Sequence, residues 1–281
     1  TTPDSDFIDV DWLQDAPGNT LLVLFHGLEG SSGSHYAQAF ADYARTHGLA
    51  FAVPHFRGCS GELNRMPRAY HSGDHAEIDW ILRRLRLRHE RLHVSGVSLG
   101  GNALLRWAQE AGHQAGELVR SLAAICAPID LAASGHAMGR GVNRWTYTPM
   151  FLRTMKHRAG QMWQRHPGLF DLGKMQRART LYDFDNVFTA PLHGFANTED
   201  YWQRASAKPG MRTITCPSLI IHARNDPFVP AHSWPQADQV SPSVVLCQTD
   251  TGGHVGFLQG PPPGRLQDLP EYLMQWWRLN P

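Results

Sequence analysis

Short apolar runs that alternate with amphipathic stretches constrain the fold of this chain more than any other feature. The runs are Thr20–Phe25, Ala50–Pro54, Leu92–Gly96, Ser121–Cys126, Ser218–His222 and Val244–Gln248. Each is nearly continuous in apolar residues, which is typical of strands covered on both faces. Strands that alternate with helical stretches predict βαβ units. We therefore expect an α/β fold with a mostly parallel central sheet flanked by helices.

Helical periodicity appears between and after these runs. The stretch Asp74–His89 carries one apolar stripe, and Leu99–Ala111 begins directly after the third run. A C-terminal helix is predicted with Pro270 in its first turn. The stripe in Asp74–His89 is Ile78, Ile81, Leu82 and Leu85, and the expected buried face of the C-terminal helix is Leu269, Tyr272, Leu273 and Trp276.

The alternation stops at about Leu131 and resumes at about Thr213. The segments Trp145–His157 and Gln161–His166 in between have a helical character. We expect a single catalytic domain with a core of residues 1–130 and 213–281. Residues 131–212 would then form a helical cap over the carboxyl edge of the sheet, the edge where such sheets bind ligands.

The motif Gly96-Val97-Ser98-Leu99-Gly100 has the form G-x-S-x-G. This pattern produces a sharp turn between a strand and a helix, which lifts the serine hydroxyl above the sheet. The pattern alone is weak, but here an apolar run precedes it and a helical stretch follows it. We therefore expect Ser98 to be a nucleophile.

A nucleophilic serine needs a histidine as base and a carboxylate that orients this histidine. In α/β sheets with such a turn, the three residues follow in the order Ser, Asp or Glu, His. Asp226 comes just after the run Ser218–His222, and His254 comes after Val244–Gln248. Both would lie at the same edge of the sheet as Ser98, so we expect a triad of Ser98, Asp226 and His254.

Other residues compete for these roles. Asp130 follows the run Ser121–Cys126 and is the main rival for the acid. Asp250 lies in one loop with His254, which makes it a weaker candidate. His222 falls within a predicted strand and is a poor candidate for the base.

The oxyanion of a tetrahedral intermediate needs at least two hydrogen-bond donors. The backbone N–H of Leu99 follows the nucleophile and is the first candidate. The loop His26-Gly27-Leu28-Glu29-Gly30 follows an early strand, and the N–H of Leu28 is the second. His26 is expected to shape the loop. A phosphate-binding role of this glycine-rich loop is disfavoured, because a G-K-[S/T] ending and a G-x-G-x-x-G fingerprint are both missing.

The composition excludes several classes of protein. The net charge of +1 gives no reason to expect a nucleic-acid partner. The 16 histidines are scattered, with no HExxH motif, so we expect neither a metal nor an organic cofactor. The four cysteines form no CxxC pair, and the sequence contains no apolar run of membrane-spanning length. The first residues do not resemble a signal peptide, so we expect a reduced, cytoplasmic protein.

Several longer motifs resemble the YheT-like branch of the α/β hydrolases. They are His26–Ser31, Phe56–Glu62, Tyr70–Gly73, Gly252–Phe257, and segments around Phe184-Asp185, Thr189–Phe195 and Asp200–Trp202. This resemblance implies the α/β-hydrolase fold and a Ser–Asp–His triad, which falls on Ser98, Asp226 and His254. It also implies esterase-type chemistry. Eukaryotic members of the branch act on acylglycerols or phospholipids, or move acyl groups to alcohols.

The expected function is therefore hydrolysis of a carboxylic ester, of short to medium acyl chain or lipid-like, through an acyl-enzyme on Ser98. Transfer of the acyl group to an alcohol, and ligand binding without catalysis, remain alternatives. The basic run Arg83–Arg91 is expected to be a solvated helix face, with membrane contact the less favoured interpretation. Four aromatics of the cap line an acyl pocket or form the core of the cap, namely Trp145, Tyr147, Phe151 and Trp163.

Overall fold

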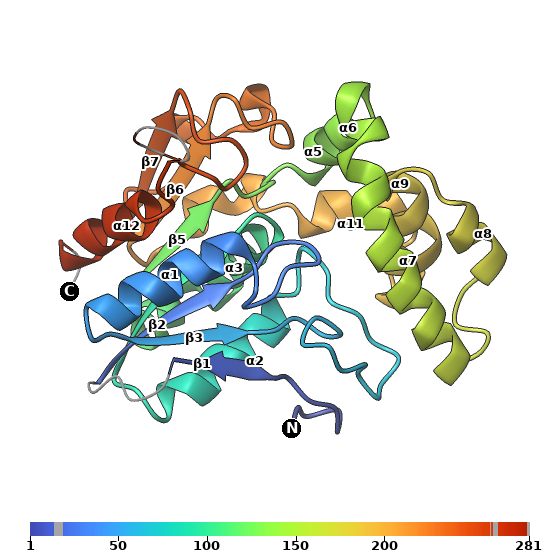
Figure 1. Ribbon diagram of the computed structural model, residues 1–281, viewed down its shortest axis with the longest axis horizontal. Helices are drawn as coiled ribbons and strands as arrows, with labels where there is room; N and C mark the ends of the chain where they lie inside the picture. The colour runs from blue at the N-terminus through green and yellow to red at the C-terminus, as the bar shows by residue number, and fades with distance from the viewer. Residues whose placement is uncertain (14–18, 259, 261–263, 280–281) are drawn as a thin grey trace.

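A computed structural model describes residues 1–13, 19–258, 260 and 264–279 of the chain. Its centre is a seven-stranded sheet in the order β1-β3-β2-β4-β5-β6-β7 (Figure 1). Only β1 runs antiparallel to its neighbour β3, and all other neighbouring strands are parallel. The strands are β1 (Val10–Trp12), β2 (Thr20–Phe25), β3 (Ala50–Pro54), β4 (Arg91–Val97), β5 (Ser121–Ile125), β6 (Ser218–Ala223) and β7 (Val244–Thr249).

All six predicted strands are confirmed, with ends that differ by one residue at most. The strand β1 was not predicted, because its three residues are too few to give a periodic signal. It lies at the edge of the sheet, where its Trp12 side chain stays exposed. The mostly parallel sheet that the alternation of apolar runs predicted is therefore present, with one short antiparallel edge strand added.

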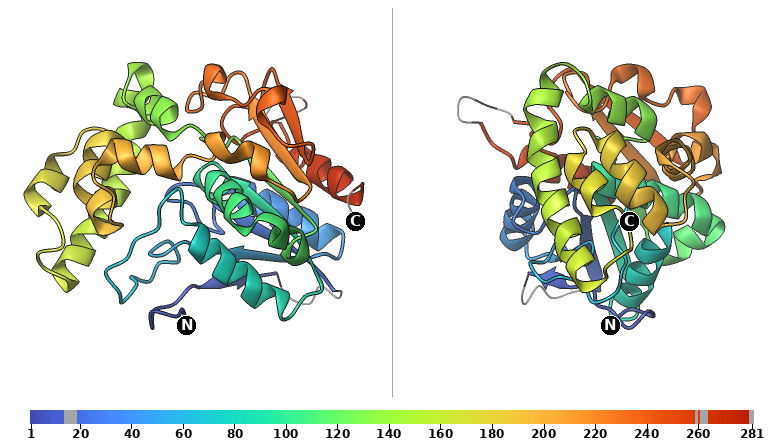
Figure 2. Two further views of the ribbon diagram at one scale, coloured as in Figure 1. Left: turned by 180° about the vertical axis from the view of Figure 1, so that it is seen from behind. Right: turned by 90° about the vertical axis from the view of Figure 1, so that its right-hand side faces the viewer.

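Helices cover both faces of the sheet (Figure 2). The helices α2 (His75–Arg86) and α3 (Leu99–Ala111) pack with alternate residues of β2 on one face. The helices α1 (His35–Thr46) and α12 (Asp268–Arg278) pack on the other. The short elements η1 (Gly112–Gln114) and α4 (Ala115–Leu118) follow α3. Two hydrophobic layers thus sandwich the sheet, which explains why its strands are apolar on both faces.

The predicted apolar stripe of α2 is confirmed, since all four of its residues are buried.

The predicted face of α12 is partly wrong. Leu269 and Leu273 are buried as expected, but Met274 and Trp277 complete the buried face, while Tyr272 is 44% exposed. The buried face is thus rotated relative to the predicted stripe. The prediction failed because Trp276 and Trp277 are adjacent, so the sequence pattern does not show which of them is buried.

Every element between β5 and β6 is helical within the described residues. Both predicted helical segments, Trp145–His157 and Gln161–His166, fall in α6, α7 and the turn after α7. The elements are α5 (Leu131–Met138), α6 (Gly141–Trp145), α7 (Tyr147–Arg165), α8 (Leu172–Arg177), α9 (Leu181–Phe184), η2 (Asp185–Thr189), α10 (Ala190–Leu192), α11 (Thr198–Ala205) and η3 (Lys208–Thr213). Two further short turns, η4 (Ala231–Ser233) and η5 (Ala237–Gln239), precede β7.

This helical segment has an apolar cluster of its own, built around Leu152, Met162, Met175, Phe184 and Phe188. Figure 1 shows the segment beside the carboxyl ends of the strands. That residues 131–212 form a cap distinct from the core of residues 1–130 and 213–281 stays a prediction.

The side chain of Asn102 ties the end of the helical segment to α3. Its Nδ2 donates to the carbonyl oxygens of Ser72 and Ala205, each at 2.8 Å, and its Oδ1 accepts from the N–H of Ala207 at 3.0 Å. Asn102 is fully buried, so these bonds satisfy an amide that would otherwise be costly to bury. They fix the point where the chain returns toward β6.

None of the helices in the described residues combines the length and the apolarity that a membrane span requires. The 19-residue helix α7 is long enough, but it carries Arg153, Lys156, Arg158 and Arg165.

Candidate active site

Ser98 occupies the turn between β4 and α3, in a backbone conformation that a serine rarely adopts. Its φ is 53° and its ψ is −120°. A non-glycine residue with positive φ costs about 1–3 kcal/mol and persists only where the surrounding structure enforces it. Here the strand before the turn and the helix after it enforce the conformation. The predicted strand–turn–helix context of the G-x-S-x-G motif is therefore present.

Two glycines make this turn sterically feasible. A Cβ on Gly96 would lie 2.5 Å from the carbonyl oxygen of Gly100. A Cβ on Gly100 would lie 2.5 Å from the carbonyl oxygen of His26 and 2.6 Å from that of Phe25. All of these neighbours are backbone atoms, which cannot move aside. The tight packing of the turn against β2 thus requires glycine at both positions.

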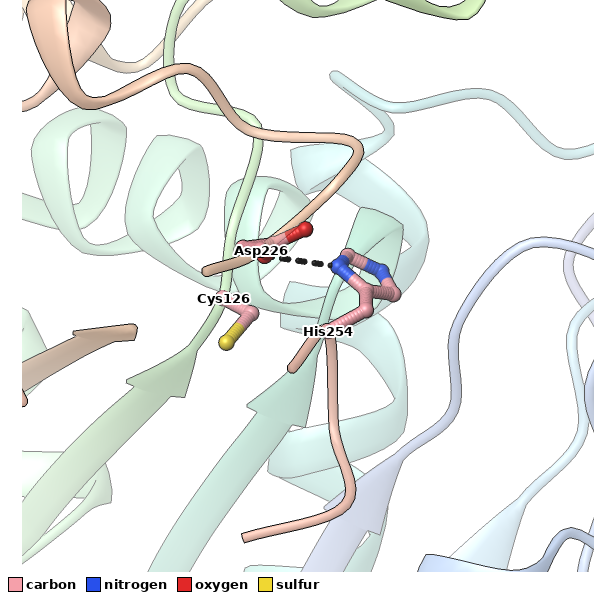
Figure 3. A group of neighbouring side chains, drawn as sticks. All are labelled: Cys126, Asp226 and His254. Carbon is pink, nitrogen blue, oxygen red and sulfur yellow. Dashed lines mark hydrogen bonds and ion pairs between the residues drawn. The ribbon is translucent and has the colours of Figure 1, made fainter. Parts of the chain in front are cut away.

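The structure brings Ser98, His254 and Asp226 together from three strand ends. His254 Nε2 lies 2.7 Å from Ser98 Oγ, and His254 Nδ1 lies 2.9 Å from Asp226 Oδ2. Figure 3 shows the second of these contacts, with the carboxylate of Asp226 facing the imidazole. The two ring nitrogens of His254 therefore connect the serine hydroxyl to the carboxylate in one line.

Asp226 is held by the loop that follows β6. Its Oδ1 accepts from the N–H of Phe228 at 2.7 Å and from that of Val229 at 3.3 Å. Its side chain has no solvent exposure. Because Oδ1 is occupied, Oδ2 is directed at His254 and accepts a hydrogen bond from Nδ1–H. Nε2 is then left unprotonated, which is the state that accepts a proton from Ser98.

The loop that carries His254 depends on glycine and on its neighbours. Gly253 has a φ of 61°, and its N–H donates to Asn225 Oδ1 at 2.8 Å. The Phe228 ring packs on the imidazole with a centroid separation of 4.5 Å. These contacts join the loop after β6 to the loop after β7, and they restrict the orientation of the His254 ring.

The rival residues lie in other environments. The Asp130 carboxylate caps α5 by accepting from the N–H of Ala133 at 3.0 Å, and it lies 3.7 Å from Lys208 Nζ. Asp250 is exposed and pairs with Arg224 at 3.1 Å. His222 is buried within β6 and stacks on Trp234. None of the contacts described for these three residues involves Ser98 or His254.

The two predicted oxyanion donors both line the pocket above Ser98. Leu99 is the first residue of α3, so its N–H has no acceptor within the helix. Leu28 lies in the loop after β2, where the Gly27 N–H donates to the Tyr36 hydroxyl at 2.8 Å. The predicted pair of N–H groups is thus placed on two segments that meet beside Ser98.

His26 holds this loop, as expected from the sequence. Its Nε2 accepts from the N–H of Phe56 at 3.0 Å, so Nδ1 carries the proton and donates to the Gly27 carbonyl at 2.8 Å. Burial lowers the pKa of His26 to about 3, so the ring is neutral at physiological pH. A neutral imidazole with both nitrogens bonded is a structural element of the loop.

A buried polar cluster supports the same loop from the opposite side. Glu29 has a φ of 57°, and its Oε1 accepts from the Tyr70 hydroxyl at 2.8 Å. Arg158 of α7 reaches the same oxygen at 3.1 Å and the sulfur of Cys59 at 2.8 Å. Helix α7 is therefore linked directly to the loop that carries Leu28.

An apolar pocket of about 940 Å³ opens above Ser98. It lies between the strand ends and the helical segment, so both contribute to its wall. Among the cap aromatics, Tyr147 and Phe151 line it, whereas Trp163 packs in the cluster of the helical segment and Trp145 is 78% exposed. Its apolar wall includes Leu131, Met138, Met150, Phe151, Met155, Phe228 and Val255.

Cys126, Asp226 and His254 form one group whose potential metal-binding atoms lie within 4.8 Å of one another (Figure 3). The sequence did not indicate this group. Burial raises the pKa of the Cys126 thiol well above its ordinary value, and the nearby Asp226 carboxylate raises it further. The thiol is therefore protonated, and Asp226 and His254 already bond to each other. A metal at this position would have to break that bond.

Sequence reasoning missed several residues around the site. Phe228, Asn225 and Tyr36 contact the loops of the candidate triad and oxyanion site directly. Phe228 and Asn225 flank the Asp226-Pro227 pair, so their position beside a candidate acid was a usable signal. Tyr36 and Arg158 gave no such signal, because each reaches the site only through the packing of its helix.

The fold and the pocket define an α/β hydrolase of the esterase and lipase type. Residues 20–261 match the family described as alpha/beta hydrolase fold. The chain belongs to this family, in the branch of the Escherichia coli (strain K12) protein named "Putative esterase YheT". It is 38% identical to that protein over 265 residues, which cover 92% of this chain and 77% of the relative.

More distant proteins share the same architecture. The chain is 28% identical over 268 residues to the Saccharomyces cerevisiae protein "Medium-chain fatty acid ethyl ester synthase/esterase 2". The match covers 85% of this chain but only 58% of the yeast protein. Among solved structures, the mouse alpha/beta hydrolase domain-containing protein 10 aligns with a TM-score of 0.61 at 15% identity. That alignment covers 99% of this chain and 97% of the mouse protein, and it supports the fold assignment alone.

Proposed function

We propose that the protein hydrolyses carboxylic esters through an acyl-enzyme on Ser98, with His254 as the base and Asp226 as the residue that orients it. The observation that carries this proposal is the continuous line of contacts from Ser98 Oγ to His254 Nε2 at 2.7 Å and from His254 Nδ1 to Asp226 Oδ2 at 2.9 Å. These are the distances that proton transfer from a nucleophile requires.

In the acylation step, Ser98 Oγ attacks the ester carbonyl carbon while His254 Nε2 takes the hydroxyl proton. The resulting oxyanion accepts hydrogen bonds from the N–H groups of Leu28 and Leu99. The C–O bond to the alcohol then breaks, and the imidazolium returns the proton to the leaving alkoxide. Asp226 stabilises the imidazolium through its contact with Nδ1.

In the second step, water takes the place of the alcohol. His254 removes a proton from the water as it attacks the acyl carbonyl, and the same N–H groups hold the second oxyanion. Collapse of that intermediate breaks the bond to Ser98 Oγ, which takes the proton back from His254. The acid leaves and Ser98 is regenerated.

The pocket supports a substrate with an apolar acyl or alkyl group. It measures about 940 Å³, and Met138, Met150, Met155, Phe151 and Phe228 contribute to its apolar wall. A pocket of this kind gains binding energy from each methylene group that it removes from water, about 0.8 kcal/mol. We therefore propose acyl chains longer than acetyl as the preferred substrates.

The test is a series of p-nitrophenyl esters with increasing acyl length, assayed with wild type and Ser98→Ala. We expect kcat/KM to rise from acetyl toward medium chains in wild type and activity to vanish in Ser98→Ala. A fluorophosphonate probe should label wild type and not Ser98→Ala. Equal rates in the two proteins would refute the proposal, and unlabelled Ser98 in folded wild type would instead favour a binding protein.

Transfer of the acyl group to an alcohol is the second candidate. The yeast relative, whose name includes both a synthase and an esterase activity, favours it. The acyl-enzyme would be the same, and an alcohol would replace water in the second step. Product analysis with added ethanol separates the two reactions: ethyl ester that increases with ethanol indicates transfer, and free acid alone indicates hydrolysis.

A further inference from the structure

Helix α6 and the first turns of α7 expose several large apolar side chains close together in the chain. Val142 is 73% exposed, Trp145 is 78% exposed, and Met150 is 49% exposed. Tyr147 beside them is 39% exposed. We call this group, together with Arg140, Arg144 and Arg153, the α6–α7 surface. Single exposed apolar residues are ordinary, but four of them within the nine residues 142–150 are unusual and indicate an interaction site.

The segment that carries these side chains is basic. Residues 131–170 contain six Lys and Arg and not one Asp or Glu, although the whole chain has a net charge of only +1. Arg140, Arg144 and Arg153 are exposed, and none of the ion pairs found among the described residues includes them. The Arg144 guanidinium lies over the ring of Trp145 at 5.7 Å. An exposed cation stacked on an exposed indole suits the boundary between water and lipid.

The α6–α7 surface is also continuous with the pocket above Ser98. Tyr147 and Met150 belong to both the surface and the pocket wall. The Tyr147 ring packs on Phe228 at 4.7 Å, and Phe228 packs on His254 at 4.5 Å. Asn143 Nδ2 of α6 donates to the carbonyl oxygen of Pro227 at 2.6 Å, next to Asp226. Contact at this surface therefore takes place at the mouth of the pocket.

We propose that the α6–α7 surface docks on an anionic lipid bilayer. The apolar side chains would enter the headgroup region, and the three arginines would lie against anionic headgroups. The combination of exposed apolar side chains and unpaired positive charge favours a bilayer with anionic headgroups, because an uncharged apolar partner would gain nothing from the charge. The proposal concerns binding and does not depend on the reaction at Ser98.

The basic run Arg83–Arg91 lacks these properties. Arg83 pairs with Asp79 at 2.7 Å, and Arg84 packs at 5.6 Å on Trp80, which is half-buried where Trp145 is exposed. Glu90 lies within the run, and Leu87 is its single strongly exposed apolar residue. The run therefore provides a matched control with the same number of removable charges and no apolar cluster.

The experiment measures sedimentation with vesicles, using the full chain with Ser98→Ala so that turnover of lipid plays no part. Vesicles of phosphatidylcholine alone are compared with vesicles that contain phosphatidylglycerol. One variant combines Arg140→Gln, Arg144→Gln and Arg153→Gln, and a second combines Val142→Ser, Trp145→Ser and Met150→Ser. The control combines Arg84→Gln, Arg88→Gln and Arg91→Gln. Thermal unfolding of each variant checks that it is folded.

We expect at least tenfold stronger binding to the phosphatidylglycerol vesicles. Each arginine near a lipid surface contributes about a fivefold factor, so the first variant should bind about 100-fold more weakly. The second variant should lose at least tenfold, and the control only a few-fold. Binding that is absent in the Ser98→Ala parent chain, or lost equally in the control, overturns the proposal. Unchanged lipid binding in the second variant with a changed oligomeric state would identify the surface as an interface between protein chains.

Discussion

Arg158 of helix α7 reaches 3.1 Å from Glu29 Oε1, and the two residues are 129 positions apart in the chain. Glu29 is the residue directly after Leu28, the proposed oxyanion donor. The ion pair is largely shielded, since the side chains are 28% and 8% exposed. The helical segment is thus linked to the loop that would stabilise the transition state.

Replacing Arg158 by Gln should therefore affect catalysis as well as stability. The Glu29 carboxylate would lose its cationic partner while it remains buried, which costs about 1–3 kcal/mol. We expect a lower free energy of unfolding and a decrease of about tenfold in kcat/KM, because the position of Leu28 would be less fixed. Arg153→Gln on the same helix is the control. It should leave urea unfolding and the hydrolysis of soluble esters unchanged.

Asp226→Asn tests the assignment of the acid. An amide cannot select the tautomer of His254 that leaves Nε2 unprotonated, so kcat should fall by about 10⁴ while the protein stays folded. Asp130→Asn is the matched comparison, because Asn also caps a helix. It should retain both stability and kcat. The reverse pattern in a p-nitrophenyl ester assay would assign the acid to Asp130.

Gly100→Ala tests the packing of the turn at Ser98. The added Cβ would lie 2.5 Å from the His26 carbonyl oxygen, and a backbone atom cannot move aside. We expect a loss of more than about 2 kcal/mol in unfolding free energy. Gly116→Ala in α4 is the control, since a Cβ there meets nothing within 4 Å. It should stabilise the protein by about 0.5–1 kcal/mol, and equal effects of both variants in denaturant titrations would contradict the structural explanation.

The free energy of unfolding should fall in acid, because several buried histidines take up protons more readily in the unfolded chain. Burial lowers the pKa of His222 from an ordinary value of 6.5 to about 4. The native state therefore binds fewer protons than the unfolded chain between these values, so the stability present above pH 6.5 is lost as the pH falls toward 4. The other histidines with pKa values lowered to about 3 or 4 are His26, His71, His93 and His193.

His222→Phe should remove one of these contributions. The two ring nitrogens of His222 are buried without a hydrogen-bond partner among the described residues, so a phenyl ring loses no bond. We expect the slope of unfolding free energy against pH between 6.5 and 4 to decrease by about 1.4 kcal/mol per pH unit. Stability at pH 7.5 should change little. Exposed His157→Gln should leave the slope as it is, and a slope unaffected by His222→Phe would show that this histidine is charged in the native state.

The sequence predicted the inner strands of the sheet because each of them is covered on both faces. The runs Thr20–Phe25 and Ala50–Pro54 match β2 and β3 in full, and Leu99–Ala111 matches α3. The edge strand β1 was missed because its three residues are too few to give a pattern, whereas the six-residue edge strand β7 was predicted although part of it is exposed. The face of α12 was misassigned, since only contact with the sheet decides which of its aromatics is buried.

For the candidate site, the sequence by itself determined which residues can come together. The position of Ser98, Asp226 and His254 after successive strands implies a common edge, because parallel strands all end on the same side of a sheet. Only the tertiary structure decided the distances and tautomer that these residues adopt, the link from Arg158 to Glu29, and the basic apolar surface at the mouth of the pocket. These features depend on how the helices between β5 and β6 pack, and packing between residues far apart in the chain has no local periodicity to reveal it.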